Sequence, residues 1–224
     1  MSAFSEHLET VQERIARAQQ RAGRTPQSTQ LVAVTKGHPP ERVREAIEAG
    51  LTVFGENRVQ ELLAKSAVLP SSISWHLIGH LQSNKIRKVL PVCSLIHSVD
   101  SVELARDVDR IAAELGLFPQ ILLQVNVSGE TSKFGFNPDS LLANLTSLLE
   151  LKRASVIGMM TMAPLSENPE SVRPVFRSLR EFRDRCEAES GTPLPVLSMG
   201  MTSDFEVAIE EGATHVRIGS ALFA

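Results

Sequence analysis

The sequence predicts an α/β fold, a (β/α)8 TIM-type barrel in a single domain with an extra N-terminal helix. Strand-like and helix-like segments alternate about eight times along the chain. A helical segment precedes the first strand, and the 224 residues approach the length of about 250 that is typical of such barrels. We therefore expect residues 1–224 to form one barrel domain. An open doubly wound sheet is the rival fold, but no GxGxxG motif follows the first strand.

The first half of the chain alternates helices and short strands. Apolar residues at positions 8, 11, 15 and 18 form one stripe of the leading helix, which stops at Gly23. Pro40 suits the first position of a helix that Gly50 ends, and Asn57 suits the N-cap of the next helix. We expect helices over 3–22, 40–50, 57–69 and 83–90, and strands over 31–36, 52–55, 74–78 and 92–97.

The second half continues the alternation. Ser203-Asp204-Phe205-Glu206 has the spacing of a capping box and opens a short helix that Gly212 closes. No helix is expected after the last strand, because the sequence ends at Ala224, and the leading helix would fill that gap. We expect helices over 101–115 and 138–150, a long helix from Asn168-Pro169 whose apolar stripe reaches Cys186, and strands over 121–127, 154–160, 194–198 and 215–220.

Composition narrows the class of protein. The net charge is −3 and no basic stripe stands out, so we expect no nucleic-acid partner. The N-terminus lacks the apolar core of a signal peptide, and no apolar run approaches the roughly 18 residues of a membrane span. Cys93 and Cys186 form no CxxC motif, which suits a reducing compartment. We expect a cytoplasmic protein without a membrane partner, and a monomer.

The first strand ends in a candidate nucleophile. Residues 31–37 form an apolar run that ends in Lys36 and Gly37, and with period two Lys36 shares a face with Val34 and Val32. If both faces of this strand are buried, the amine points inward, and burial disfavours the charged form of a lysine. A neutral amine attacks carbonyl compounds and gives a Schiff base. The alternative is a lysine that ends a strand and reaches back to solvent.

The ends of the last two strands suit a phosphate group. Strand seven is expected to end in Ser198-Met199-Gly200-Met201, and strand eight gives Arg217-Ile218-Gly219-Ser220. Glycines let backbone N–H groups approach a ligand, and the serines can donate hydroxyl hydrogen bonds. The alternative is that the glycines only make tight turns.

Arg217 is expected to point into the barrel with Gly219, where an arginine needs an acceptor, either a ligand or a structural salt bridge. An aldehyde that carries a phosphate would satisfy both this end of the barrel and Lys36. His76 and His80 lie about 13 Å apart on a strand, too far for one ion, so we expect no metal and structural or hydrogen-bonding roles.

Segments along nearly the whole chain carry a family resemblance: LVAVTK, FGENRVQE, WHLIGHLQSNK, IHSVD, VNVSGETSKFGF, IGMMTMAP and LSMGMTSDFEVAIEEGATHVRIGSALF. They are similar to those of the pyridoxal-phosphate homeostasis protein family, single-domain relatives of the alanine racemase N-terminal barrel. The resemblance implies pyridoxal 5′-phosphate bound as a Schiff base on Lys36, with Asn57 beside it and Arg217 facing the pyridine nitrogen. It also implies phosphate contacts from Ser198, Met199, Gly200, Gly219 and Ser220. The chain departs from the family after the lysine, where it reads Gly-His-Pro-Pro and relatives commonly have a second lysine.

Three functions share this cofactor or this lysine. The first is a carrier or buffer of pyridoxal 5′-phosphate in intracellular vitamin B6 and amino-acid homeostasis, which could serve apo forms of pyridoxal-phosphate enzymes. The second is a racemase-like amino-acid enzyme. Racemases of the related barrel use a tyrosine opposite the lysine, and this chain contains no tyrosine, so we expect no catalytic residues and no turnover. The third, a Schiff-base aldolase for sugar phosphates, predicts no bound chromophore.

Overall fold

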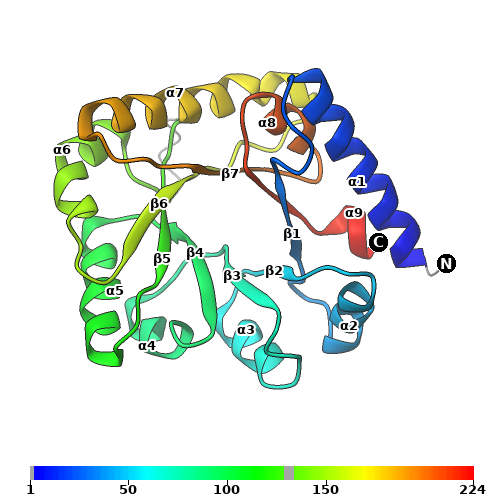
Figure 1. Cartoon of the computed structure of the whole chain (residues 1–224), viewed down its shortest axis with the longest axis horizontal. Coiled ribbons are helices and arrows are strands. Elements are labelled where there is room, and N and C mark those ends of the chain that lie inside the picture. The colour runs from blue at the N-terminus through cyan, green and yellow to red at the C-terminus, as the bar shows by residue number, and fades with distance from the viewer. Residues whose placement is uncertain (1–2, 129–133) are drawn as a thin grey trace.

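The computed structural model describes residues 3–128 and 134–224, and eight parallel strands in it close into a barrel (Figure 1). Each strand pairs with the next in sequence, and β1 pairs with β8. The predicted (β/α)8 barrel is therefore confirmed. The strands are β1 Gln30–Val34, β2 Val53–Glu56, β3 Ser74–Leu77, β4 Cys93–Val99, β5 Gln120–Gln124, β6 Ser155–Met160, β7 Val196–Met201 and β8 His215–Ile218.

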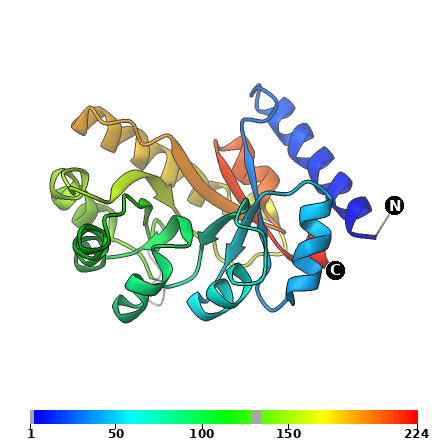
Figure 2. The same ribbon diagram turned by 60° about the horizontal axis from the view of Figure 1, so that its bottom comes forward.

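Helices surround the sheet on its outer side (Figure 2). Local sequence signals set several of their ends: Ser101 caps one helix by accepting a hydrogen bond from the Leu104 N–H, and Gly116 ends it in the left-handed conformation. The helices are α1 Ala3–Arg21, α2 Pro40–Glu48, α3 Val59–Ser66, η1 Ser83–Lys85, α4 Ile86–Val89, α5 Val102–Leu115, α6 Pro138–Leu149, η2 Pro169–Val172, α7 Arg173–Ser190, α8 Phe205–Glu210 and α9 Ser220–Phe223. Among the described residues, none of these helices is both long enough and apolar enough to cross a bilayer.

Strand residues alternate between two apolar layers. Ile121 and Leu123 belong to the large core between the sheet and the helices, whereas Leu122 packs with Leu95 and Met160 in a separate cluster inside the barrel. This alternation is the period of two that an extended chain imposes. It also fixes which face of each strand can serve a site in the barrel interior.

The leading helix closes the wall of helices. The α1 ring of Phe4 lies 5.2 Å from the ring of Phe223 in α9, and the α1 residue Arg14 pairs with Glu206 of α8 at 2.9 Å. The expected placement of α1 beside the last strand is therefore correct (Figure 1). The expectation that no helix follows β8 is wrong, because the last residues form the short helix α9.

Several element ends differ from the sequence predictions. Strand β7 continues to Met201, beyond the predicted end at Ser198. The N-cap of α3 is Arg58 rather than Asn57, which lies one residue earlier. The predicted capping box at 203–206 does not form: Asp204 occupies the N-cap of α8, and its carboxylate accepts a hydrogen bond from the Met201 N–H. Hydrogen bonds to neighbouring strands and loops decide these ends, and local patterns do not contain them.

Candidate functional site

The carboxyl ends of the eight strands form one rim of the barrel, which we call the rim. The structure brings Lys36, Asn57, Gly219 and Ser220 to it, because each of them lies one or two residues after the end of a strand. The other predicted site residues lie within β7 and β8, below the rim. They are Ser198, Met199, Gly200 and Arg217.

Lys36 is exposed at the rim. Strand β1 ends at Val34, and Lys36 lies in the turn that follows Thr35. The expectation of a buried amine is therefore wrong, because β1 ends two residues earlier than predicted and the lysine lies beyond its last ladder hydrogen bonds. The alternative that we left open, a lysine at a strand end that reaches solvent, describes its position correctly.

The turn after β8 lies against the end of β1. A Cβ atom on Gly219 would stand 3.1 Å from the Val34 carbonyl oxygen and 3.3 Å from the Val34 Cβ, so a larger residue here would press on the residues before Lys36. The exposed Ser220 hydroxyl donates a hydrogen bond to the Thr202 hydroxyl over 3.2 Å. The sequence did not single out Thr202, which directly follows the end of β7 at Met201. Two hydroxyl groups therefore gather beside the Lys36 turn.

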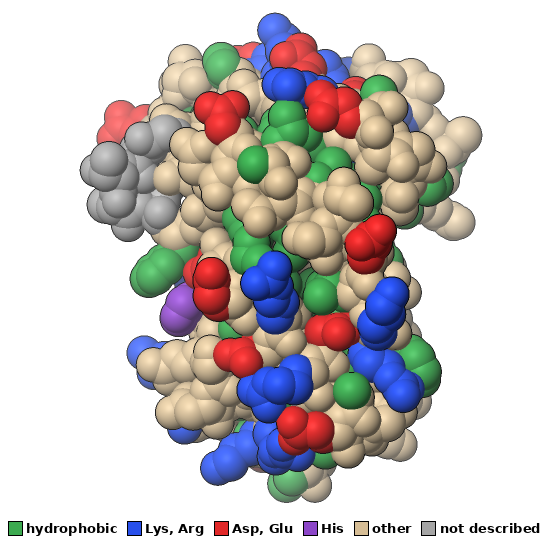
Figure 3. All heavy atoms as spheres, turned by 90° about the vertical axis from the view of Figure 1, so that its left-hand side faces the viewer, with side chains coloured by type: hydrophobic (Ala, Val, Ile, Leu, Met, Phe, Trp, Pro, Cys, Tyr) green, Lys and Arg blue, Asp and Glu red, His purple; other side chains and the backbone are tan. Residues whose placement is uncertain are grey.

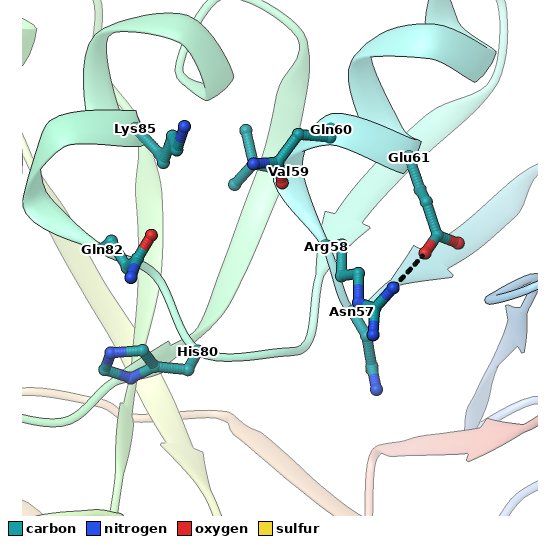
Figure 4. A pocket seen from close by; sticks show the side chains of 8 residues that line it. All are labelled: Asn57, Arg58, Val59, Gln60, Glu61, His80, Gln82 and Lys85. Carbon is teal, nitrogen blue, oxygen red and sulfur yellow. Dashed lines mark ion pairs between the residues drawn. The ribbon is translucent and has the colours of Figure 1, made fainter.

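Asn57 is held at the rim by close packing of two strand ends. A Cβ atom on Gly79 would stand 2.1 Å from the Asn57 carbonyl oxygen, so only glycine permits this approach after β3. Asn57 lines a cavity of about 580 Å³ between the loops that follow β2 and β3, and it is the predicted site residue that does so (Figure 4). The other lining residues are Arg58, Val59, Gln60, Glu61, His80, Gln82 and Lys85.

A hydrogen-bonded chain of polar side chains lies inside the barrel below the rim. Arg217 donates one hydrogen bond to the Ser198 hydroxyl at 2.6 Å and another to the Thr161 carbonyl oxygen at 3.0 Å. The Ser198 hydroxyl lies 2.8 Å from His97 Nδ1, and His97 Nε2 lies 3.0 Å from His76 Nδ1. The inward direction predicted for Arg217 is therefore confirmed, and the acceptors that it needs belong to the protein.

The direction of this chain follows from its donors. Arginine only donates, so the Ser198 oxygen accepts from Arg217, and its hydrogen is left to point to His97 Nδ1, the other partner of this hydroxyl among the described residues. A neutral His97 then carries its proton on Nε2 and donates it to His76 Nδ1. The proton of His76 is thereby placed on Nε2. These hydrogen bonds link Arg217 through Ser198 and His97 to His76.

Burial sets the charges of these side chains and of His215 in β8, whose ring stacks on that of His76 with centroids 6.0 Å apart. It lowers the pKa of His76 to about 3 and of His215 to about 4, and it holds the pKa of His97 well below its ordinary value. Burial also lowers the pKa of Arg217 to about 10, against the opposing effect of Asp204. At neutral pH the three histidines are uncharged and Arg217 is a cation.

In the described ranges 3–128 and 134–224, no cluster of three or more His, Cys, Asp or Glu has the arrangement of a metal site.

Ser198 takes part in this arrangement through its side chain. Its hydroxyl is fully buried and engaged by Arg217 and His97, because β7 runs three residues beyond it. Met199 is also fully buried and belongs to the core between the sheet and the helices.

His97, Thr161 and His215 were missed, since an apolar strand with one polar residue gives no local sign of its partners. Residues 129–133 of the VNVSGETSKFGF motif lie outside the described residues.

The fold and the rim define a single barrel of the kind that forms the N-terminal part of alanine racemases. The family described as "Alanine racemase, N-terminal domain" matches residues 7–224. An alanine racemase from Clostridium difficile superposes with a TM-score of 0.74 at 15% identity, and the match covers 97% of this chain and 55% of the racemase, which shows the fold alone.

More similar proteins specify the family. The pyridoxal phosphate homeostasis protein of Aquifex aeolicus is 48% identical over 219 residues, which cover 97% of this chain and 96% of the relative. The structure of PipY from Synechococcus elongatus with PLP bound has a TM-score of 0.87 at 41% identity and covers 99% of this chain and 100% of PipY. The chain belongs to the pyridoxal phosphate homeostasis protein family.

Proposed function

We propose that this protein binds pyridoxal 5′-phosphate at the rim, with the Lys36 amine joined to the cofactor aldehyde as a Schiff base. We further propose that it acts as a carrier or buffer in intracellular vitamin B6 and amino-acid homeostasis. It would work as a cytoplasmic monomer that supplies apo forms of pyridoxal-phosphate enzymes. The observation that supports the proposal is the close approach of Gly219, which precedes the exposed Ser220, to Val34 at the end of β1, two residues before the exposed Lys36.

The residues at the rim fit such a ligand. Lys36 offers an accessible amine, and the Ser220 and Thr202 hydroxyls offer donors for a phosphate. Gly219 has no side chain, so its backbone N–H can approach a ligand closely. Arg217 adds a positive charge within the barrel below these groups. When bound, pyridoxal phosphate supplies the aldehyde and an electron-withdrawing ring.

Two features of the chain favour a carrier over a catalyst. The sequence has no tyrosine, so the second base of a lysine–tyrosine pair is missing. The residue that the family resemblance assigns to the ring nitrogen is a cation, Arg217, whereas strong electron sinks use a carboxylate there. General acid–base help is worth about 10²- to 10⁴-fold in rate, so the loss of one base should be severe.

One observation favours the racemase-like alternative. His80 lies at the rim after β3, and its Nδ1 stands 3.2 Å from Asp100 Oδ2, the arrangement in which a carboxylate orients an imidazole base. The ring also stacks on Phe134 with centroids 4.6 Å apart. His80 is therefore the residue that could replace the absent tyrosine.

The test of cofactor binding is optical and chemical. Purified protein mixed with pyridoxal 5′-phosphate should absorb visible light, and borohydride should then fix a pyridoxyl group on the peptide that contains Lys36. Lys36→Ala should abolish this label, while Lys88→Ala, the matched control at another exposed lysine, should keep it. A label on Lys85 or Lys65 in the wild type would contradict the proposal. A protein that forms a borohydride-sensitive adduct with sugar phosphates but never turns yellow would indicate an aldolase.

The test of the carrier role compares transfer with turnover. Loaded protein should pass its cofactor to an apo-enzyme and leave L-alanine in deuterated water unchanged. Exchange of the α-hydrogen at about 1 s⁻¹, the low end of ordinary enzymes, would overturn the carrier role. If this exchange disappears in His80→Asn, the racemase-like alternative holds.

A further inference from the structure

The two residues that flank Lys36 are both held by side chains from outside its turn. The Lys65 ammonium of α3 donates to the Thr35 carbonyl oxygen at 2.7 Å, and the Thr35 hydroxyl donates to Glu56 at 2.5 Å. On the other side, the Gly37 N–H donates to Glu61 of α3 at 3.0 Å. The backbone before and after the lysine is thereby tied to β2 and α3.

A buried ion pair forms the centre of this arrangement. Lys65 Nζ lies 2.5 Å from Glu56 Oε1 and 4.0 Å from Glu61 Oε2, and the Glu56 side chain is fully buried while that of Lys65 is 6% exposed. Glu56 lies on the outer face of the sheet, because the preceding Gly55 faces Val32 and Ile78 inside the barrel. The pair therefore stands behind the Lys36 turn, outside the barrel interior.

Stability alone does not explain this pair. Removing two charges from water costs free energy that their attraction often only balances, and well-packed apolar residues serve a core equally well. The second carboxylate oxygen of Glu56 is buried and has no hydrogen-bond partner among the described residues, which adds to the cost. The pair instead does what apolar residues cannot do: it binds polar groups of the residue next to Lys36.

We propose that Lys65, Glu56 and Glu61 are positioning residues that hold the Lys36 amine in the orientation needed to react with an aldehyde. This inference rests on the proposed function of Lys36. Because Lys36 is exposed, its long side chain has no wall of its own to fix it, and its backbone must supply the order. A displacement of about 1 Å can slow a reaction on the order of 10²-fold.

The experiment compares two ligands in matched variants. Pyridoxal 5′-phosphate reports on bond formation through its visible absorption, and pyridoxine 5′-phosphate, which has no aldehyde, reports on binding at the rim alone. Lys65→Met by itself would leave Glu56 buried without its cation, so the double variant Lys65→Met/Glu56→Gln is used, together with Glu61→Ala. Both should form the coloured adduct about 10- to 100-fold more slowly and still bind pyridoxine 5′-phosphate as the wild type does.

Two further variants separate positioning from a general structural effect. Glu61→Gln keeps an acceptor for the Gly37 N–H and should restore the rate lost in Glu61→Ala. Glu45→Ala, at a half-exposed glutamate of α2 that pairs with Arg42, should react as the wild type does. Wild-type rates in both test variants, or an equal loss of binding for both ligands, would overturn the inference. If the wild type forms no adduct at Lys36, the proposed function fails first, and the inference fails with it.

Discussion

Arg217 donates a hydrogen bond of 2.6 Å to the Ser198 hydroxyl inside the barrel, below the rim. Both side chains are almost completely buried. Ser198, to which the family resemblance assigns a phosphate contact, accepts a hydrogen bond from a buried cation in this structure. This contact also separates Ser198 from Ser220, which stays exposed at the rim.

Substitution of the two serines should have different effects. Ser198→Ala should lower the free energy of unfolding by about 1–3 kcal/mol, because it leaves an Arg217 donor without its acceptor. Ser220→Ala should leave stability unchanged and weaken retention of pyridoxal 5′-phosphate by about 0.5–3 kcal/mol. Urea unfolding and equilibrium dialysis measure the two effects, with the exposed Ser71→Ala as the control. An equal loss of stability in both serine variants would contradict a structural role for Ser198 and a ligand-binding role for Ser220.

The buried histidines predict that the free energy of unfolding decreases as the pH is lowered. An unfolded histidine takes up a proton at its ordinary pKa of about 6.5. Burial keeps the pKa of His76 at about 3 and that of His215 at about 4 in the folded protein. The unfolded state therefore binds more protons below about pH 6.5, so stability that is complete above this pH is lost as the pH falls towards 4.

Urea unfolding across this pH range measures the loss. His215→Gln removes one of the contributing groups. The slope of the free energy of unfolding against pH should then correspond to about one proton fewer taken up on unfolding. A free energy of unfolding that stays constant from neutral pH to about pH 4.5 would show that the histidines are accessible to protons in the folded barrel.

The contact between Phe4 and Phe223 predicts that α1 is part of the stable fold. Phe4 is 1% exposed, so Phe4→Ala should lower the free energy of unfolding by about 3–5 kcal/mol through the lost burial and the cavity left behind. Arg17→Ala, on the exposed face of the same helix, should change it by less than about 0.5 kcal/mol. Unfolding of both variants in denaturant measures the two changes in free energy. Equal, small effects would mean that α1 is dispensable for the barrel.

Local patterns predicted the strands and helices well because their causes are local. Apolar runs and period-two alternation revealed all eight strands, and alternation within β8 correctly turned Arg217 inward. The same patterns misjudged strand ends by two or three residues at β1, β7 and β8. Those ends depend on ladder hydrogen bonds to neighbouring strands. Two residues at the end of β1 decide whether Lys36 is buried or exposed.

The sequence by itself determined the barrel, the family and the set of chemical groups on offer, because periodicity, turns and motifs are written in neighbouring positions. Only the tertiary structure decided how these groups are connected. Ser198 contacts His97 across 101 positions of sequence, and Lys65 reaches Thr35 across 30. Such contacts arise when closure of the sheet brings distant strands together, and no local pattern encodes them. They determine that Ser198 serves Arg217 and that a buried ion pair stands behind Lys36.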